Sequence, residues 1–84
     1  MKLRVALAQV NPTVGDLAGN AALIKQSVAT AAAQGAQIAI FPEMVLTGYP
    51  VEDLALRPSF QEASRLALAE LATEIDPNIV AIIG

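Results

Sequence analysis

The stretch 38–43 reads Ile38-Ala39-Ile40-Phe41-Pro42-Glu43, and it decides the fold of this chain. Its first four side chains are apolar, which predicts a strand that is covered on both faces, as in a parallel sheet. Pro42 has no N–H for a sheet ladder, so the strand should end there. Glu43 is then expected just outside the carboxyl end of the strand, where open α/β sheets bind ligands. We interpret Glu43 either as an active-site carboxylate or as a structural anchor of the following loop.

The sequence on both sides of this stretch alternates between strand and helix patterns. Strands are expected at residues 3–9, 37–41 and 79–83, and helices from about residue 17 to 34 and from about 60 to 75. A strand, a crossover helix and a second apolar strand form a right-handed unit with parallel strands. The sequence therefore predicts an α/β fold with the order βαβαβ.

Residues at the predicted helix ends match known capping patterns. Asp16 is the expected N-cap of the first helix and Gly35 its left-handed stop, with Asn20 as the rival cap. Ser59 and Glu62 have the spacing of a capping box at the start of the second helix.

The connection 42–58 is longer than the roughly 12–15 residues that compact domains usually allow. It is too apolar to be disordered, so we expect an ordered active-site loop with a short helical turn near residues 52–56. Glu52 and Asp53 could form a metal pair, but no third ligand accompanies them. We therefore interpret them as caps of that turn and predict no metal site.

Bulk composition limits the possible functions. The 84 residues are 55% hydrophobic, above the roughly 45–50% of ordinary globular chains. A chain this short buries only about 60–65% of its unfolded surface, so some apolar surface should contact the rest of a larger domain or a partner chain. The net charge is −3 and no basic patch with aromatic residues occurs, which argues against nucleic-acid binding. Cysteine and histidine are absent, so the chain offers neither a thiolate nor the commonest metal ligand.

The N-terminus lacks the sustained apolar core and the cleavage site of a signal peptide. No apolar run reaches the ~18 residues of a membrane-crossing helix. We therefore expect a soluble, cytoplasmic protein that does not bind membranes.

Three motifs also resemble a known family. Phe41-Pro42-Glu43 resembles the glutamate motif of the nitrilase (carbon–nitrogen hydrolase) superfamily. The runs Ala8–Asn20 and Leu46–Leu54 are more particular, and together the three motifs resemble the N-terminal glutaminase domain of the glutamine-dependent NAD synthetases. The similarity extends without an obvious break from Val5 to Gly84.

This resemblance implies that residues 1–84 are the N-terminal part of a carbon–nitrogen hydrolase (glutaminase) domain. The fold would be the βαβαβ portion of a nitrilase-like four-layer α-β-β-α sandwich, incomplete in this chain. Glu43 would be the catalytic base that deprotonates a cysteine, and a lysine would stabilise the oxyanion. The family's lysine and cysteine come later in the chain and Lys25 is not that lysine, so this piece alone should be inactive.

Two expectations concern the surroundings of Glu43. Phe41, Met44 and Tyr49 would form apolar walls beside the carboxylate and partly desolvate it. Tyr49 would bind substrate beside Glu43, and the alternative is that Tyr49 packs the loop onto the sheet.

In the full-length family members, ammonia from glutamine passes to a second domain that uses ATP to amidate deamido-NAD. ATP and Mg are therefore expected as cofactors of the full-length protein, with none in this piece, and we expect a homo-oligomer. Two alternatives stay open: a fragment of a stand-alone amidase of the same superfamily, and a non-catalytic α/β association module.

Overall fold

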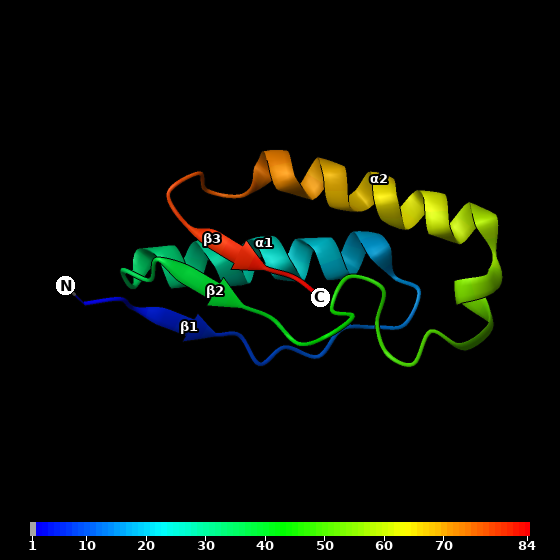
Figure 1. The fold of residues 1–84 in the computed structure, drawn as a ribbon, viewed down its shortest axis with the longest axis horizontal. Helices are drawn as coiled ribbons and strands as arrows, with labels where there is room; N and C mark the ends of the chain where they lie inside the picture. The colour runs from blue at the N-terminus through cyan, green and yellow to red at the C-terminus, as the bar shows by residue number, and fades with distance from the viewer. Residues whose placement is uncertain (1) are drawn as a thin grey trace.

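The computed structural model describes residues 2–84, which form one sheet covered by two helices (Figure 1). In chain order the elements are β1 (Val5–Leu7), α1 (Leu17–Ala33), β2 (Ile38–Ile40), the 3₁₀ helix η1 (Glu52–Leu56), α2 (Pro58–Glu74) and β3 (Val80–Ile82). The sheet order is β1-β2-β3 and both strand pairs are parallel. The predicted α/β fold with the order βαβαβ is confirmed, although each strand is shorter than expected.

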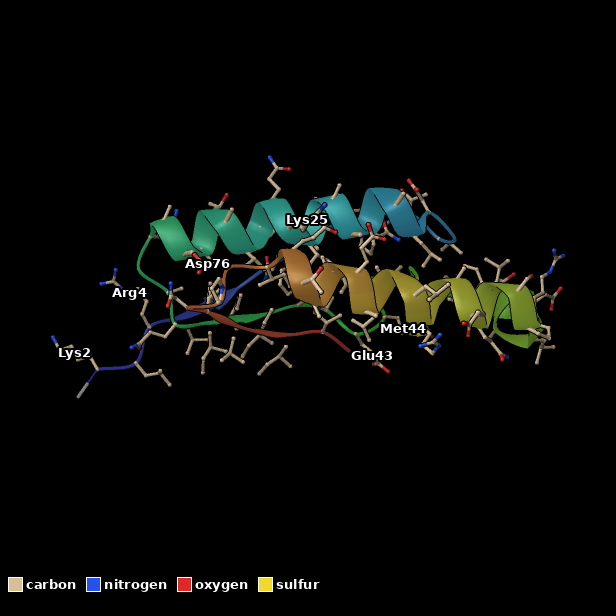
Figure 2. The ribbon with its side chains drawn as sticks, turned by 90° about the horizontal axis from the view of Figure 1, so that it is seen from above. Lys2, Arg4, Lys25, Glu43, Met44 and Asp76 are labelled. Atoms are coloured by element: carbon tan, nitrogen blue, oxygen red, sulfur yellow. The ribbon has the colours of Figure 1, made fainter. Side chains whose placement is uncertain are left out.

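The sheet has one covered face and one open face. Both helices lie on the same side of it (Figure 2). Ala6, Ala39 and Ala81 occupy one row of the sheet register and pack into the core on the helix side. The alternate side chains on the other side are large, apolar and exposed; we call this surface the open face: Val5, Leu7, Ile40, Val80 and Ile82. The prediction that the strand 38–41 is covered on both faces is therefore wrong within residues 2–84.

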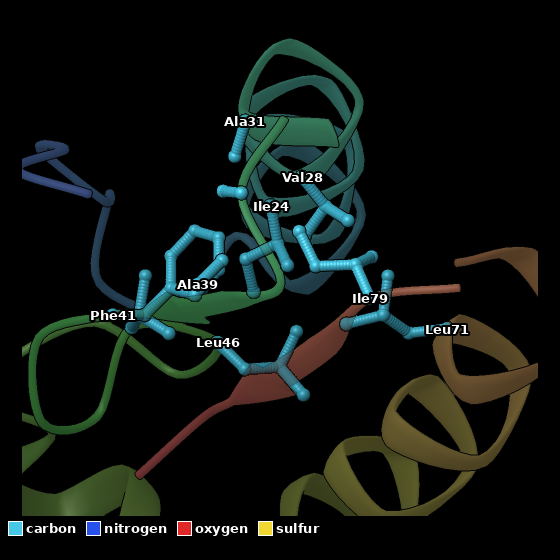
Figure 3. Packing of buried hydrophobic residues seen from close by; sticks show 10 residues of the cluster. Ile24, Val28, Ala31, Ala39, Phe41, Leu46, Leu71 and Ile79 are labelled. Atoms are coloured by element: carbon cyan, nitrogen blue, oxygen red, sulfur yellow. The ribbon is translucent and has the colours of Figure 1, made fainter. Parts of the chain in front are cut away.

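The core lies between α1, the sheet and one turn of α2 (Figure 3). Ile24, Val28 and Ala31 of α1 pack over Ala39, which is fully buried. From α2, Leu71 is the side chain that is fully buried. The helices are also joined at the surface, where Lys25 Nζ lies 3.0 Å from Glu74 Oε2. Lys25 therefore belongs to an ion pair between helices.

The ends of α1 follow the sequence-based prediction. The Asp16 carboxylate accepts a hydrogen bond of 3.0 Å from the Gly19 N–H. Gly35 adopts a left-handed φ of 83°, and the next N–H, that of Ala36, donates back to the Ala31 carbonyl at 3.0 Å. Asn20, the rival cap, lies inside the helix and is buried.

The predicted capping box of the second helix is wrong. α2 begins at Pro58, with Arg57 in the cap position and no side-chain cap. Proline already has a helical φ and lacks the N–H that a cap would satisfy, so the helix starts before Ser59. Glu62 instead pairs with Arg65 at 2.6 Å, and this guanidinium lowers the pKa of the exposed Glu62 carboxyl.

The predicted short helical turn is confirmed as η1, but its two acidic residues do not cap it. Val51 is the cap residue, and no side-chain cap hydrogen bond is formed. Glu52 and Asp53 lie in the first turn instead. None of the helices in the described part of the chain is long and apolar enough to cross a membrane.

Candidate functional site

Glu43 lies at the carboxyl end of the sheet, as predicted. The ladder continues one residue past β2, because the Phe41 N–H donates to the Ile82 carbonyl at 3.0 Å. Pro42 then ends the pairing, and Glu43 begins a turn over residues 43–47. Figure 2 shows the Glu43 side chain pointing away from the two helices, toward the side of the open face.

The chain after β3 passes close to Glu43. A Cβ atom added to Gly84 would lie 3.1 Å from the Glu43 Cα and 3.7 Å from its Cγ. The first distance is shorter than ordinary van der Waals contact, so a glycine at this position allows the two strand ends to approach. Glu43 is thus placed by the ends of β2 and β3 together.

Of the three residues expected to form apolar walls beside Glu43, Phe41 and Tyr49 do not do so, and Met44, the next residue in the turn, is half-buried. Glu43 is exposed, and the Tyr49 side chain is 74% exposed. Phe41 is buried, but its ring packs in the core on the helix side (Figure 3). Phe41 therefore supports the end of the strand and does not desolvate the carboxylate.

Tyr49 follows the 43–47 turn and is joined to Pro50 by a cis peptide bond. Its exposure contradicts the alternative in which it packs the loop onto the sheet. Among residues 2–84 no group of three potential metal ligands occurs, and Glu52 and Asp53 stay an adjacent pair on η1.

The 43–47 turn is held firmly although Glu43 itself is exposed. The side chains of Val45 and Leu46 are buried and anchor the turn to the core. The Gly48 N–H donates to the Met44 carbonyl at 2.8 Å and closes the turn. Met44 has a positive φ of 58°, an uncommon conformation for a residue with a side chain. An ordered turn of this kind fixes the direction in which Glu43 leaves the sheet.

A second loop, residues 11–16, packs against this turn. The Gly15 N–H donates to the Thr47 carbonyl at 2.9 Å. Gly48 has a φ of 81°, and a Cβ atom there would lie 2.5 Å from the Val14 Cα, which is closer than atoms can approach. Gly48 is thus required both by its backbone conformation and by the contact between the loops.

Asn20 joins the same two loops from α1, and the sequence-based reasoning missed this role. Its Nδ2 donates to the carbonyls of Thr13 and Leu46, each at 2.8 Å, and its Oδ1 accepts from the Thr13 N–H at 2.8 Å. The sequence pattern could have indicated this role, because Asn20 lies at helical spacing on the apolar stripe of α1 that also holds Ile24 and Val28. A buried polar residue on an apolar stripe requires hydrogen-bond partners.

Comparison with known proteins assigns the family. Residues 4–84 match the carbon-nitrogen hydrolase family, so the chain belongs to that family. Within it, the chain is similar to glutamine-dependent NAD(+) synthetases. It is 44% identical over 80 residues to the enzyme of Synechocystis sp., which covers 95% of this chain and 14% of that enzyme.

Solved structures agree with this assignment. The glutamine-dependent NAD+ synthetase of Acinetobacter baumannii, in complex with ADP, matches with a TM-score of 0.90 and 38% identity over 100% of this chain and 16% of that one. An amidase from Nesterenkonia sp. AN1 matches with a TM-score of 0.69 and 29% identity over 83% of this chain and 28% of that one. That amidase is a double mutant, with a glutamate changed to glutamine and a cysteine to alanine, in complex with acrylamide. The three parallel strands and two helices therefore match part of the fold of these enzymes, and the chain spans about a seventh of the curated relative's length.

The two loops can be tested through their glycines. We expect Gly48→Ala to lower the midpoint temperature of unfolding more than Gly35→Ala does. Both positions have a left-handed φ, which costs a residue with a Cβ roughly 1–2 kcal/mol. At Gly35 the added Cβ meets only the flexible Arg4 side chain, whereas at Gly48 it meets the main chain of Val14. Equal midpoints in a thermal unfolding experiment would contradict the close contact between the loops.

Proposed function

We propose that residues 1–84 are the N-terminal part of the glutaminase domain of a glutamine-dependent NAD synthetase, and that Glu43 is its catalytic base. The likeness to the A. baumannii synthetase over the whole of this chain carries the proposal. The placement of Glu43 supports its role, since ligands of open α/β sheets bind just outside the carboxyl ends of the strands.

The proposed chemistry is covalent catalysis with an activated nucleophile. Glu43 takes the proton of a cysteine thiol, and the thiolate attacks the side-chain amide carbon of glutamine. The C–N bond then breaks, Glu43 returns the proton to the leaving ammonia, and a thioester remains. Water hydrolyses the thioester to glutamate and free thiol, and a lysine ammonium stabilises the oxyanion in both halves. The cysteine and the lysine have no assigned positions in residues 1–84.

The ammonia would supply the ATP-dependent amidation of deamido-NAD in a synthetase domain outside this chain. ATP and Mg²⁺ would bind to that domain. We further propose that the full-length protein is a homo-oligomer and that the open face of the sheet is covered by the second sheet of an α-β-β-α sandwich. The large apolar side chains on the open face support its cover by a second sheet, because an exposed patch of this kind usually marks a contact surface.

A stand-alone amidase is the second candidate. The Nesterenkonia amidase supports it, since that enzyme matches 83% of this chain with a TM-score of 0.69 and 29% identity. The synthetase is favoured because its likeness extends over the whole chain with a higher TM-score and a higher identity.

The role of Glu43 is testable in the full-length protein. We expect Glu43→Gln to lower glutamine-dependent NAD formation by about 100-fold or more, because general base catalysis contributes about 10²–10⁴-fold. NAD formation from added ammonia should stay within about twofold, because it bypasses the base. Steady-state rates with each nitrogen source measure both.

Glu70→Gln is the matched control, since Glu70 is an exposed glutamate on α2. It should leave both rates unchanged. Loss of both activities in Glu43→Gln would show that Glu43 is structural and would end its assignment as the base.

We also propose that Tyr49 contacts the substrate through its hydroxyl. Tyr49→Phe should then raise the KM for glutamine by about threefold to tenfold, which corresponds to one lost hydrogen bond, with little change in kcat. The KM for ammonia should not change. An unaltered KM for glutamine would exclude the hydroxyl from substrate binding.

Residues 1–84 alone should not hydrolyse glutamine. Of the three catalytic residues that the proposed chemistry uses, only the glutamate is assigned here, and the sequence contains no cysteine. The measurement is ammonia release from glutamine by the purified piece. Hydrolysis above the rate of a Glu43→Gln piece would contradict the proposed mechanism.

A further inference from the structure

Asn20 is the buried polar residue of the described chain, with 2% of its surface exposed. It lies on the inner face of α1, one turn before Ile24, whose side chain is fully buried in the core. The burial of Ile24 fixes α1 against the sheet. The Asn20 side chain therefore projects from the helix at a defined position. A group on a rigid element can hold a loop more accurately than another loop can.

The three hydrogen bonds of Asn20 involve both N–H donors of its carboxamide and the carboxamide oxygen. Both hydrogens of Nδ2 are donated, one to the Thr13 carbonyl and one to the Leu46 carbonyl, and Oδ1 accepts from the Thr13 N–H. No buried side-chain nitrogen or oxygen within residues 2–84 lacks a partner. Aspartate has the same shape but cannot donate to the two carbonyls, and alanine can make none of the three bonds.

The bond to Leu46 connects Asn20 with the turn that presents Glu43. Leu46 is three residues after Glu43 in the 43–47 turn, and its side chain is buried on the same side as α1. Two further contacts join the loops at this point: the Gly15 N–H to the Thr47 carbonyl, and the close passage of Gly48 over Val14. The other two contacts are made by backbone atoms, whereas the bond from Asn20 to Leu46 is made by a side chain. Substitution of Asn20 therefore removes this bond and leaves the two backbone contacts in place.

We propose that Asn20 is a positioning residue for Glu43: by fixing the Leu46 carbonyl to α1 and to the 11–16 loop, it sets where the carboxylate stands relative to its substrate. This inference rests on the proposed function of Glu43. Asn20 does not touch the substrate, so its loss displaces the base without removing it. A displacement of about 1 Å is enough to lower a catalysed rate on the order of 100-fold.

The test uses Asn20→Asp and Asn20→Ala in the full-length protein, with Asn78→Asp as the matched control. Asn78 is exposed in the turn between α2 and β3, so its variant adds the same charge away from the two loops. We expect both Asn20 variants to lower kcat for glutamine-dependent NAD formation at least about tenfold. The KM for glutamine and the ammonia-dependent rate should stay within about threefold, and Asn78→Asp should behave as the unmodified protein.

Each other result overturns the inference. If the Asn20 variants have the same kcat for glutamine-dependent NAD formation as Asn78→Asp, the 43–47 turn does not need the Asn20 carboxamide. A rise in KM with unchanged kcat makes Asn20 a determinant of glutamine binding. Loss of the ammonia-dependent rate or of the folded state in both Asn20 variants assigns Asn20 to the fold alone. If Glu43→Gln retains glutamine-dependent activity, the proposed function fails first, so the two failures are distinguishable.

Discussion

The close packing of α1 on a row of alanines is the contact on which the rest of the structure depends. Ala6, Ala39 and Ala81 are aligned across the three parallel strands and face the helices. Small side chains in this row allow Ile24 and Val28 to reach the sheet and to fill the space between the layers. Because α1 is fixed in this way, its N-terminal part gives a firm surface for two loops. These are the 11–16 loop, which follows β1, and the 43–47 turn, which follows β2.

The same alternation accounts for the open face. Residues on either side of each alanine point the other way, since successive side chains of a strand face opposite sides. In this chain those residues are larger and are exposed, so the sheet directs most of its apolar bulk away from its own helices. Part of the hydrophobic content of 55% therefore lies on a surface suited to a second apolar layer.

Glu43 combines an exposed carboxylate with a tightly held backbone. Phe41 is buried before it and Val45 after it, and the end of the chain passes beside it at Gly84. The charge can thus stand at the sheet edge without being desolvated by these residues, while its position is fixed by packing on both sides. For the general base that we propose Glu43 to be, geometry of this kind matters as much as proton affinity.

Local patterns in the sequence were sufficient for the element order, the cap at Asp16, the left-handed stop at Gly35 and the short helix at residues 52–56. They also placed Glu43 at the end of a strand. These features depend on a few neighbouring residues, so the sequence determines them by itself. The capping box at Ser59 failed because Pro58, one residue earlier, is the better start of a helix.

Only the tertiary structure decided the environment of the site. Phe41 and Tyr49 are close to Glu43 in sequence, yet one faces the core and the other is exposed, because the direction of a side chain follows from packing. The role of Asn20 needed three segments to meet: α1, the 11–16 loop and the 43–47 turn. Hydrogen bonds between residues as far apart as Asn20 and Leu46 depend on how the chain returns on itself, and local residue patterns do not specify that.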